Sequence, residues 1–239
     1  MIPKVIHYCW FGRGEKPRQV QACIRSWRRF CPDYKIVEWN EDNFDVSRHP
    51  YTAYCHREKK WAYLSDFVRL AVVEAHGGLY FDTDVEAVAS FDDLLDNPAF
   101  YCFETPRYVA TGLGFGSVAH HPTVAAMLRQ YDGQVAEDGS VSLTACPALN
   151  TQPLLALGLE QTGALQRVGG ALILPSEYLN PYEDCTGRMR RTANTHSIHW
   201  YSKSALPWWA KVRSALTRPF HRLFGEDCFR WLKGRGVRE

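Results

Sequence analysis

The sequence of 239 residues lacks several features that would place it in a common class. No apolar run approaches the roughly 18 residues that a membrane-spanning helix needs. The formal net charge is only +2, which argues against a nucleic-acid binder. None of the eight cysteines forms a C-x-x-C pair, which argues against a zinc ribbon or a thioredoxin-like site. No leader of basic and then apolar residues precedes the first expected strand, so we expect a cytosolic protein with reduced thiols.

A dinucleotide-binding fingerprint is also missing. The stretch from Gly112 to Gly116 reads G-L-G-F-G instead of G-x-G-x-x-G, and it does not lead from a strand into an obvious helix. We expect it to allow close backbone packing or to form a mobile acceptor loop. A disulfide between Cys23 and Cys31 stays open as the alternative to reduced thiols.

The N-terminal part predicts a strand, a helix and a second strand. Residues 4–11 are apolar and aromatic, residues 18–30 show helical spacing, and residues 34–39 alternate. Such a unit is typical of doubly wound nucleotide-binding folds, which bind ligands at the carboxyl ends of their strands. Trp10 lies at such an end, although spacing alone favours a core or rim aromatic.

The run from Trp61 to Val88 is the centre of the sequence, because it combines a helix, a stop, a short strand and two aspartates. Apolar residues recur at helical spacing over residues 64–75. Gly77-Gly78 end this helix, because glycine adopts the left-handed conformation without strain. Leu79-Tyr80-Phe81 then predicts a buried strand. The chain is long enough for one α/β domain built around this run.

Two aspartates, Asp82 and Asp84, follow the expected strand. They converge on one cation if the segment stays extended, because residues i and i+2 share a face, and they divide roles if it bends. Carboxylates suit Mg²⁺ or Mn²⁺, which bind phosphate oxygens. A bare D-x-D is usually a solvated turn, but here it follows a helix on which Asp66 and Arg69 lie three apart and so neighbour each other.

The run SDFVRLAVVEAHGGLYFDTDVEAV resembles the signature of the family 32 DXD sugar-binding glycosyltransferases. This family includes bacterial capsule and lipopolysaccharide transferases and fungal initiating mannosyltransferases, and the glucosylating domains of clostridial toxins are more distant relatives. IPKVIHYCWFG and Ser197-Ile198-His199-Trp200 match two further family motifs. The resemblance implies a single GT-A-like α/β domain over residues 1–206, with a Rossmann-like nucleotide-binding half and a mixed central sheet.

The resemblance also implies a metal site for Mn²⁺ or Mg²⁺. Asp84 is the strongest expected metal ligand, and Asp82 contacts ribose, sugar or the metal through water. His199 aligns with the family histidine and is the expected further metal ligand. The alternative interpretation is a histidine of the core or of an interface. Lys203 is expected to bind the diphosphate through its positive charge. The alternative is a solvated lysine without a ligand.

Sugar and base contacts follow from the same resemblance. The tryptophan that matches Trp10 packs on the nucleotide base in relatives, and the residues that match Asp66 and Arg69 hold sugar hydroxyls. Arg69 is otherwise only the ion-pair partner of Asp66. Cys146 stands before a proline where relatives usually have glycine, so no contact is carried over for it. Ala205 follows Ser204 where relatives often have a tryptophan that closes on the diphosphate, and Trp200 or Trp208-Trp209 are the candidate substitutes.

The tail, residues 207–239, differs in composition from the rest. It carries eight Lys and Arg against three acidic residues, a local charge of +5, and aromatic and apolar residues are interleaved with the cations. Basic amphipathic helices of this kind lie on anionic membranes. The alternative is a terminal helix that packs on the domain with a solvated basic face.

We therefore expect a glycosyltransferase that moves a sugar from a nucleotide-sugar, a UDP-sugar in preference to GDP-mannose, to a glycan or lipid-linked acceptor in surface polysaccharide synthesis. Retention of configuration is implied by the resemblance; an inverting enzyme would need a base such as Glu104, Glu183 or Asp184. The expected location is cytoplasmic and peripheral on the inner face of the membrane, with no nucleic-acid partner. A non-catalytic sugar- or membrane-binding relative and an aspartate-based phosphatase are the alternatives.

Overall fold

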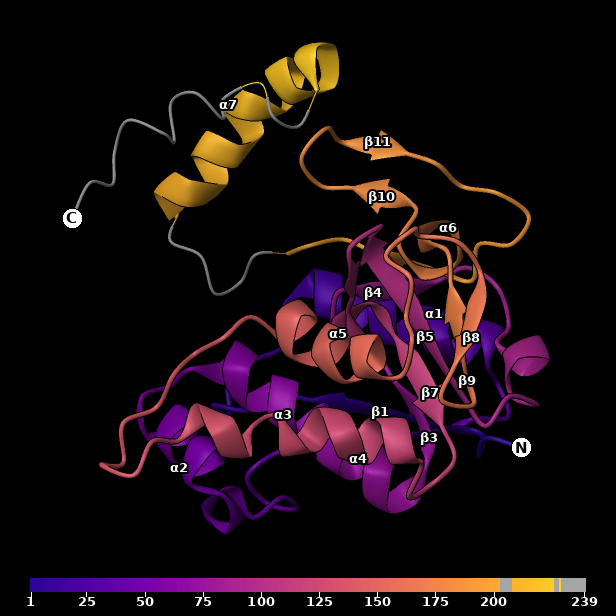
Figure 1. Cartoon of the computed structure of the whole chain (residues 1–239). Coiled ribbons are helices and arrows are strands. Elements are labelled where there is room, and N and C mark those ends of the chain that lie inside the picture. Colours follow the sequence, from indigo (N-terminus) through magenta and orange to yellow (C-terminus); the bar gives the residue numbers. More distant parts are fainter. Residues whose placement is uncertain (203–207, 226–227, 229–239) are drawn as a thin grey trace.

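The computed structural model describes residues 1–202, 208–225 and 228. A mixed sheet with the strand order β2-β1-β3-β7-β5-β9-β8 forms its centre, and β6 pairs with β5 (Figure 1). The β1–β2, β1–β3 and β5–β9 pairs are parallel, whereas β3–β7, β5–β7 and β8–β9 are antiparallel. The expected α/β class with a mixed central sheet is confirmed. The strands span Val5–Cys9 (β1), Lys35–Trp39 (β2), Gly78–Tyr80 (β3), Ala99–Thr105 (β5), Tyr108–Val109 (β6), Phe115–Ser117 (β7), Gln166–Val168 (β8) and Ala171–Leu174 (β9).

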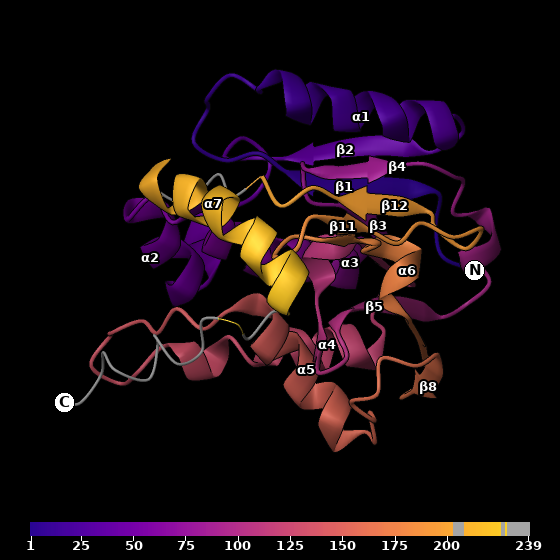
Figure 2. The same ribbon diagram turned by 90° about the horizontal axis from the view of Figure 1, so that it is seen from above.

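Helices cover both faces of the sheet. Figures 1 and 2 show α1 on one face and α3, α4 and α5 on the other. Side chains along β3 and the residue after it point alternately to the two faces of the sheet. Tyr80 packs into the core on the α3 side, whereas Leu79 and Phe81 pack into the core on the α1 side, so the strand contributes to both cores. The helices span Arg18–Phe30 (α1), Pro50–Arg57 (α2), Trp61–His76 (α3), Pro122–Arg129 (α4), Cys146–Ala156 (α5), Ser176–Leu179 (α6) and Trp208–Phe224 (α7).

Two small antiparallel pairs lie outside the central sheet. Val85–Ala87 (β4) pairs with Ser197–His199 (β12), and His199 is opposite Val85. Trp27 of α1 fixes β4 from the other side, since its indole Nε1 donates to the carbonyl oxygen of Val85 at 2.7 Å. Tyr182–Glu183 (β10) and Arg188–Met189 (β11) form a hairpin. The β4–β12 pair therefore brings the late histidine motif next to the aspartates that precede β4.

Several expectations about local structure need correction. The helix α3 is buried around more of its circumference than one apolar stripe, because Arg69, Leu70 and Val73 are buried while Ala75 is exposed. The helix α5 begins at Cys146, the residue that stands where relatives usually have glycine. All eight cysteines lie within the described residues and none is in a disulfide, so the alternative Cys23–Cys31 disulfide is not formed. Within the described ranges, no helix is long and apolar enough to cross a membrane.

Candidate functional site

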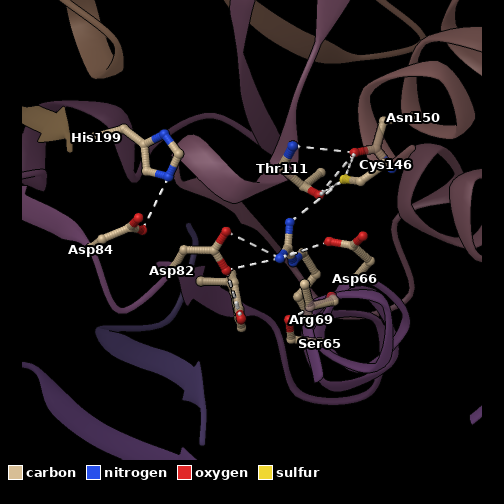
Figure 3. Close-up of polar contacts among 11 residues, drawn as sticks. Ser65, Asp66, Arg69, Asp82, Asp84, Thr111, Cys146, Asn150 and His199 are labelled. Atoms are coloured by element: carbon tan, nitrogen blue, oxygen red, sulfur yellow. Dashed lines mark hydrogen bonds and ion pairs between the residues drawn. The ribbon is translucent and has the colours of Figure 1, made fainter. Parts of the chain in front are cut away.

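The segment from Asp82 to Asp84 is a turn and not an extended strand end. The amide of Val85 donates to the carbonyl oxygen of Asp82 at 3.0 Å, which closes the turn. As a result the two carboxylates point to different partners: Asp82 faces Arg69, and Asp84 faces His199 (Figure 3). Of the two arrangements that the sequence left open, the structure has the one in which the aspartates divide their contacts.

Asp82 belongs to a partly buried cluster with Arg69 and Asp66. The Arg69 Nη2 lies 2.8 Å from Asp82 Oδ1, 3.1 Å from Asp82 Oδ2 and 2.9 Å from Asp66 Oδ1. Arg69 and Asp66 are one turn apart on α3, which explains how a single helix presents both to the site. The hydroxyl of Tyr80 also donates to Asp82 Oδ1 at 3.1 Å. One buried cation thus holds two carboxylates in place.

Burial sets the protonation of this cluster. It raises the pKa of Asp66 from 3.8 to about 6, although the charge of Arg69 acts in the opposite direction. Burial also raises the pKa of Asp82, again against the attraction of Arg69. Burial alone would lower the pKa of Arg69, but Asp82 and Asp66 outweigh it and keep the guanidinium charged. The cluster therefore holds a permanent cation beside two carboxyl groups that are costly to ionise.

Asp84 is held by the segment that follows β12. Its Oδ1 lies 3.1 Å from His199 Nε2, and its Oδ2 accepts from the backbone amide of Ser202 at 2.7 Å. Burial would raise the pKa of Asp84, but the charge of His199 and the hydrogen bonds lower it well below its usual range. The pKa of His199 is raised, because the attraction of Asp84 outweighs its burial. These contacts therefore favour the ionised form of Asp84.

Asp82, Asp84 and His199 together fit a divalent cation. One ligand atom from each lies within 4.8 Å of the others. Two carboxylates and an imidazole are donors that Mn²⁺ accepts. The buried Nδ1 of His199 has no hydrogen-bond partner among the described residues, so the ring retains coordinating capacity that the protein does not use. The three predicted metal ligands, which come from two distant segments, are thus brought together.

Three residues that the sequence did not assign complete the floor of this cluster. The thiol of Cys146 donates to Asn150 Oδ1 at 2.9 Å, and Thr111 Oγ1 donates to the same oxygen at 2.9 Å. Arg69 Nη1 lies 3.5 Å from the Cys146 sulfur (Figure 3). Burial raises the pKa of Cys146 to about 12, which keeps the thiol neutral and able to donate. The position of Cys146 before a proline, where relatives usually have glycine, was the available signal for these contacts.

Gly112 explains the glycine-rich stretch. A Cβ at this position would lie 2.5 Å from Asp82 Oδ2 and 3.0 Å from Arg69 Nη1. The backbone of residue 112 is buried and passes directly against the cluster. Close backbone packing, one of the two readings of this stretch, is therefore what the structure has at Gly112.

Trp10 lies where the sequence predicted, directly after β1. Because β1 pairs in parallel with both β2 and β3, the carboxyl ends of the three strands lie at one edge of the sheet. The Trp10 indole donates to the carbonyl oxygen of Gly14 at 2.7 Å, and the Lys16 ammonium lies 5.6 Å from the ring centroid. A cavity of about 240 Å³ opens here, lined by Trp10, Arg13, Gly14, Lys16, Glu38, Asn40, Glu41 and Asp42.

The loop after β12 is described only up to Ser202. Lys203, Ser204 and Ala205 lie outside the described residues, as does the expected contact of Lys203 with a diphosphate. Trp200, a candidate substitute for the expected tryptophan, is held through its Nε1, which donates to Glu86 Oε2 at 2.8 Å. Its ring packs on Tyr182 with a centroid distance of 5.5 Å.

The three candidate bases have different surroundings. Glu104 is the half-buried residue next to the end of β5, where burial raises its pKa and the charge of His199 opposes the shift. The hydroxyl of Tyr201 donates to Glu104 Oε1 at 3.3 Å. Glu183 accepts from the hydroxyl of Thr186, and Asp184 pairs with Arg218 at 2.8 Å, so both have partners in or near the β10–β11 hairpin. Glu104 thus interacts electrostatically with His199 of the cluster.

Comparison with known proteins agrees with the predicted resemblance. Residues 17–101 match the family described as "Glycosyltransferase sugar-binding region containing DXD motif". The chain is 27% identical over 136 residues to inositol phosphoceramide mannosyltransferase 3 of Schizosaccharomyces pombe, covering 54% of this chain and 36% of that protein. It is 36% identical over 66 residues to human alpha-1,4-N-acetylglucosaminyltransferase, covering 27% of this chain and 18% of that protein. The chain thus spans about a third or less of the length of these relatives.

A solved structure shares the fold. The chain is similar to PaToxG glycosyltransferase with a TM-score of 0.50 and 16% identity, over 66% of this chain and 72% of that chain. This likeness, together with the mixed sheet, confirms the expected GT-A-like fold. The predicted resemblance to DXD glycosyltransferases is confirmed as well. The matched region contains Trp61 to Val88 but ends before His199, so the place of this histidine rests on the geometry described above.

Proposed function

We propose that this chain, whose residues 17–101 match the DXD glycosyltransferase sugar-binding region, transfers a sugar from a nucleotide-sugar donor to a glycan or lipid-linked acceptor. One observation carries the proposal: Asp82, Asp84 and His199 converge within 4.8 Å beside the Asp66–Arg69 pair. The donor we propose is a UDP-sugar, and the process is surface polysaccharide synthesis. Residues 1–206 form the catalytic part.

The proposed metal is Mn²⁺ or Mg²⁺, held by Asp82, Asp84 and His199. When bound, the ion neutralises charge on the departing nucleoside diphosphate. Asp84 is suited to this place because it stays ionised, and the amide of Ser202 fixes its second oxygen. Asp82 is oriented by Arg69, so a part of its charge is already balanced before any ligand arrives.

The sugar and the base are assigned to opposite ends of the site. Asp66 and Arg69 are placed against sugar hydroxyls, because their contact on α3 gives a fixed pair of acceptor and donor groups. Trp10 is placed against the nucleotide base, at the edge where β1, β2 and β3 end. Lys203 is the proposed cation for the diphosphate. This division follows the assignment that the resemblance implies, and the positions of the described side chains support it.

The proposed stereochemical course is retention, as the resemblance implies. The residue that would serve an inverting enzyme best is Glu104, because burial raises the pKa of its carboxyl and it neighbours Tyr201 and His199. Glu183 and Asp184 have hairpin or α7 partners and are weaker candidates. Product configuration, measured by NMR on early product, separates the two courses.

The proposed acceptor is lipid-linked, and the proposed location is the cytoplasmic face of a membrane. One relative is named for mannosyl transfer to inositol phosphoceramide, which is a lipid. The basic tail of residues 207–239, with eight cations against three anions, supports contact with an anionic surface.

One experiment tests the proposed transferase against the two alternatives, a non-catalytic relative and an aspartate-based phosphatase. The purified chain is incubated with Mn²⁺ and a panel of UDP- and GDP-sugars, and the released nucleoside diphosphate is measured. Asp84→Asn serves as the site variant and Asp96→Asn, an exposed aspartate, as the matched control. Release that is lost in Asp84→Asn and kept in Asp96→Asn supports the transferase. Donor binding without turnover of any donor supports a non-catalytic relative, and a trapped phospho-aspartate supports a phosphatase.

A further inference from the structure

The helix α7 is amphipathic, but its polar face is turned toward the protein and its apolar face toward solvent. Among the side chains of α7 that the structure describes, the half-buried ones are Ser214, Thr217, Arg218 and His221, whose spacing places them on one side of the helix. The large exposed apolar side chains, with exposures from 51% to 76%, are Trp209, Leu216, Phe220, Leu223 and Phe224. A helix that served only to close the domain would bury this second set.

Contacts with the β10–β11 hairpin hold the polar face of α7 against the rest of the protein. Arg218 Nη2 lies 2.8 Å from Asp184 Oδ1, and Arg218 Nε donates to the Asp184 carbonyl oxygen at 3.0 Å. The Arg218 guanidinium also lies 5.9 Å from the Tyr182 ring centroid. From the hairpin, Arg188 Nη2 donates to the carbonyl oxygen of Arg222 at 2.7 Å. Figure 1 shows α7 and this hairpin together at one end of the molecule.

The apolar face of α7 is the main exposed apolar surface of the described residues. Half of the ten large exposed hydrophobic side chains lie on this one helix. The others, Met1, Tyr108, Leu157, Leu165 and Met189, come from separate parts of the sequence. Scattered exposed hydrophobic residues need no explanation, whereas a contiguous set marks an interaction surface.

The charge of α7 selects the partner. Its sequence contains Lys211, Arg213, Arg218 and Arg222 and no acidic residue. The side chains of Arg213 and Arg222 are both exposed, and helical spacing places Arg213 among the apolar residues and Arg222 outside their face. A second copy of the same helix would bring cations against cations. An anionic lipid surface instead accepts apolar side chains below its headgroups and cations among them.

We propose that α7 lies in the surface of an anionic membrane, with Trp209, Leu216, Phe220 and Leu223 at the boundary between headgroups and acyl chains. The polar face and the hairpin then attach the rest of the protein to the bilayer. Tyr182 of the hairpin packs on Trp200, which follows His199 directly, so the candidate site is connected to the docked helix through two aromatic side chains. The docking surface deepens the proposed function, and only its purpose, access to a lipid-linked acceptor, rests on that function.

Vesicle flotation tests the proposal with the full chain. One set of vesicles is phosphatidylcholine alone, and the other contains phosphatidylglycerol as well. The test variant carries Phe220→Glu and Leu223→Glu, and the matched control carries Leu157→Glu and Leu165→Glu, which change exposed apolar side chains elsewhere. All four positions are exposed, so the fold is expected to survive, and circular dichroism checks this.

The unaltered chain is expected to float with the anionic vesicles and not with phosphatidylcholine alone. The test variant should bind at least about tenfold more weakly, because two large apolar side chains no longer enter the bilayer. The control should bind as the unaltered chain does. Arg213→Gln and Arg222→Gln should each weaken binding by about fivefold at low salt.

Four results would overturn the proposal: no binding to anionic vesicles, equal binding to both vesicle types, equal loss in the test and control variants, or a solution dimer that Phe220→Glu dissociates. The last result would make a second copy the partner. Nucleoside diphosphate release without vesicles is measured in parallel and should be the same in both double variants. Flotation as expected with no release from any donor leaves the docking surface standing and removes the proposed function.

Discussion

Asp66 is a residue whose charge the folded protein holds at a cost, and the variant Asp66→Asn makes this cost measurable. A pKa raised from 3.8 to about 6 corresponds to about 3 kcal/mol lost from the free energy of unfolding at neutral pH. This loss is the net of burial and the opposing attraction of Arg69. The isosteric amide resembles the neutral acid, so Asp66→Asn should be more stable than the unaltered chain at pH 7, by about 1–3 kcal/mol.

The sign of the pH dependence follows from linkage. Because the folded-state pKa of Asp66 is raised, the folded state binds more protons than the unfolded state between pH 3.8 and about 6. The unaltered chain therefore regains stability from this group as pH falls through that window. The advantage of Asp66→Asn should be full above pH 6 and should vanish below pH 4.

Urea denaturation at pH 7, 5.5 and 4 measures both the size and the sign. Asp96→Asn serves as the control, because this aspartate is exposed, and should show no such pH-dependent difference. Donor turnover should fall by about tenfold to a hundredfold in Asp66→Asn, as expected for a lost hydrogen bond to a charged group. Destabilisation of Asp66→Asn at pH 7, or a stability difference that does not change with pH, would refute the reasoning.

Three further predictions concern side chains around the site and the core. His7 is buried, accepts a hydrogen bond from Trp39 Nε1 at its Nδ1 and faces the Gly77 carbonyl with its Nε2, and burial lowers its pKa from 6.5 to about 4. As pH falls, the unfolded state therefore binds the proton first, and the free energy of unfolding should fall by about 3 kcal/mol between pH 6.5 and pH 4. His7→Gln should remove this pH dependence in urea titrations. Cys146→Ser should keep donor turnover within about threefold while Cys146→Val lowers it about tenfold, because only serine retains a donor for Asn150; equal rates for the two variants would contradict this. Gly112→Ala should weaken Mn²⁺ binding in calorimetry by about tenfold, since its Cβ displaces Asp82, whereas Gly133→Ala, with open space around it, should bind normally; equal affinities would remove the role given to Gly112.

Periodicity and punctuation in the sequence predicted the elements that carry the site. The spacing over residues 18–30 and 64–75 and the Gly77-Gly78 stop correspond to α1, α3 and the start of β3. These signals are local, because each depends on side chains that one helix or strand presents to the core. Asp66 and Arg69 were found to be neighbours for the same reason, being one helical turn apart.

The remaining contacts of the site depend on residues that are far apart in the sequence. Arg69 and the Cys146 sulfur are 77 positions apart, and no spacing rule connects them. Two arrangements of Asp82 and Asp84 were compatible with the sequence, and the hydrogen bond from the Val85 amide to Asp82 selects the turn. The orientation of α7 is another such case, since the sequence gives two faces but only the contacts of Arg218 decide which one faces the hairpin.

A metal titration of nucleoside diphosphate release tests the central claim most directly. The best donor from the panel is held at saturation while Mn²⁺ is added to the unaltered chain, to Asp84→Asn and to Asp96→Asn. We expect metal-dependent release that falls by about a hundredfold or more in Asp84→Asn and is unchanged in Asp96→Asn. Equal release by the unaltered chain and Asp84→Asn, or release that is independent of the metal, would contradict it.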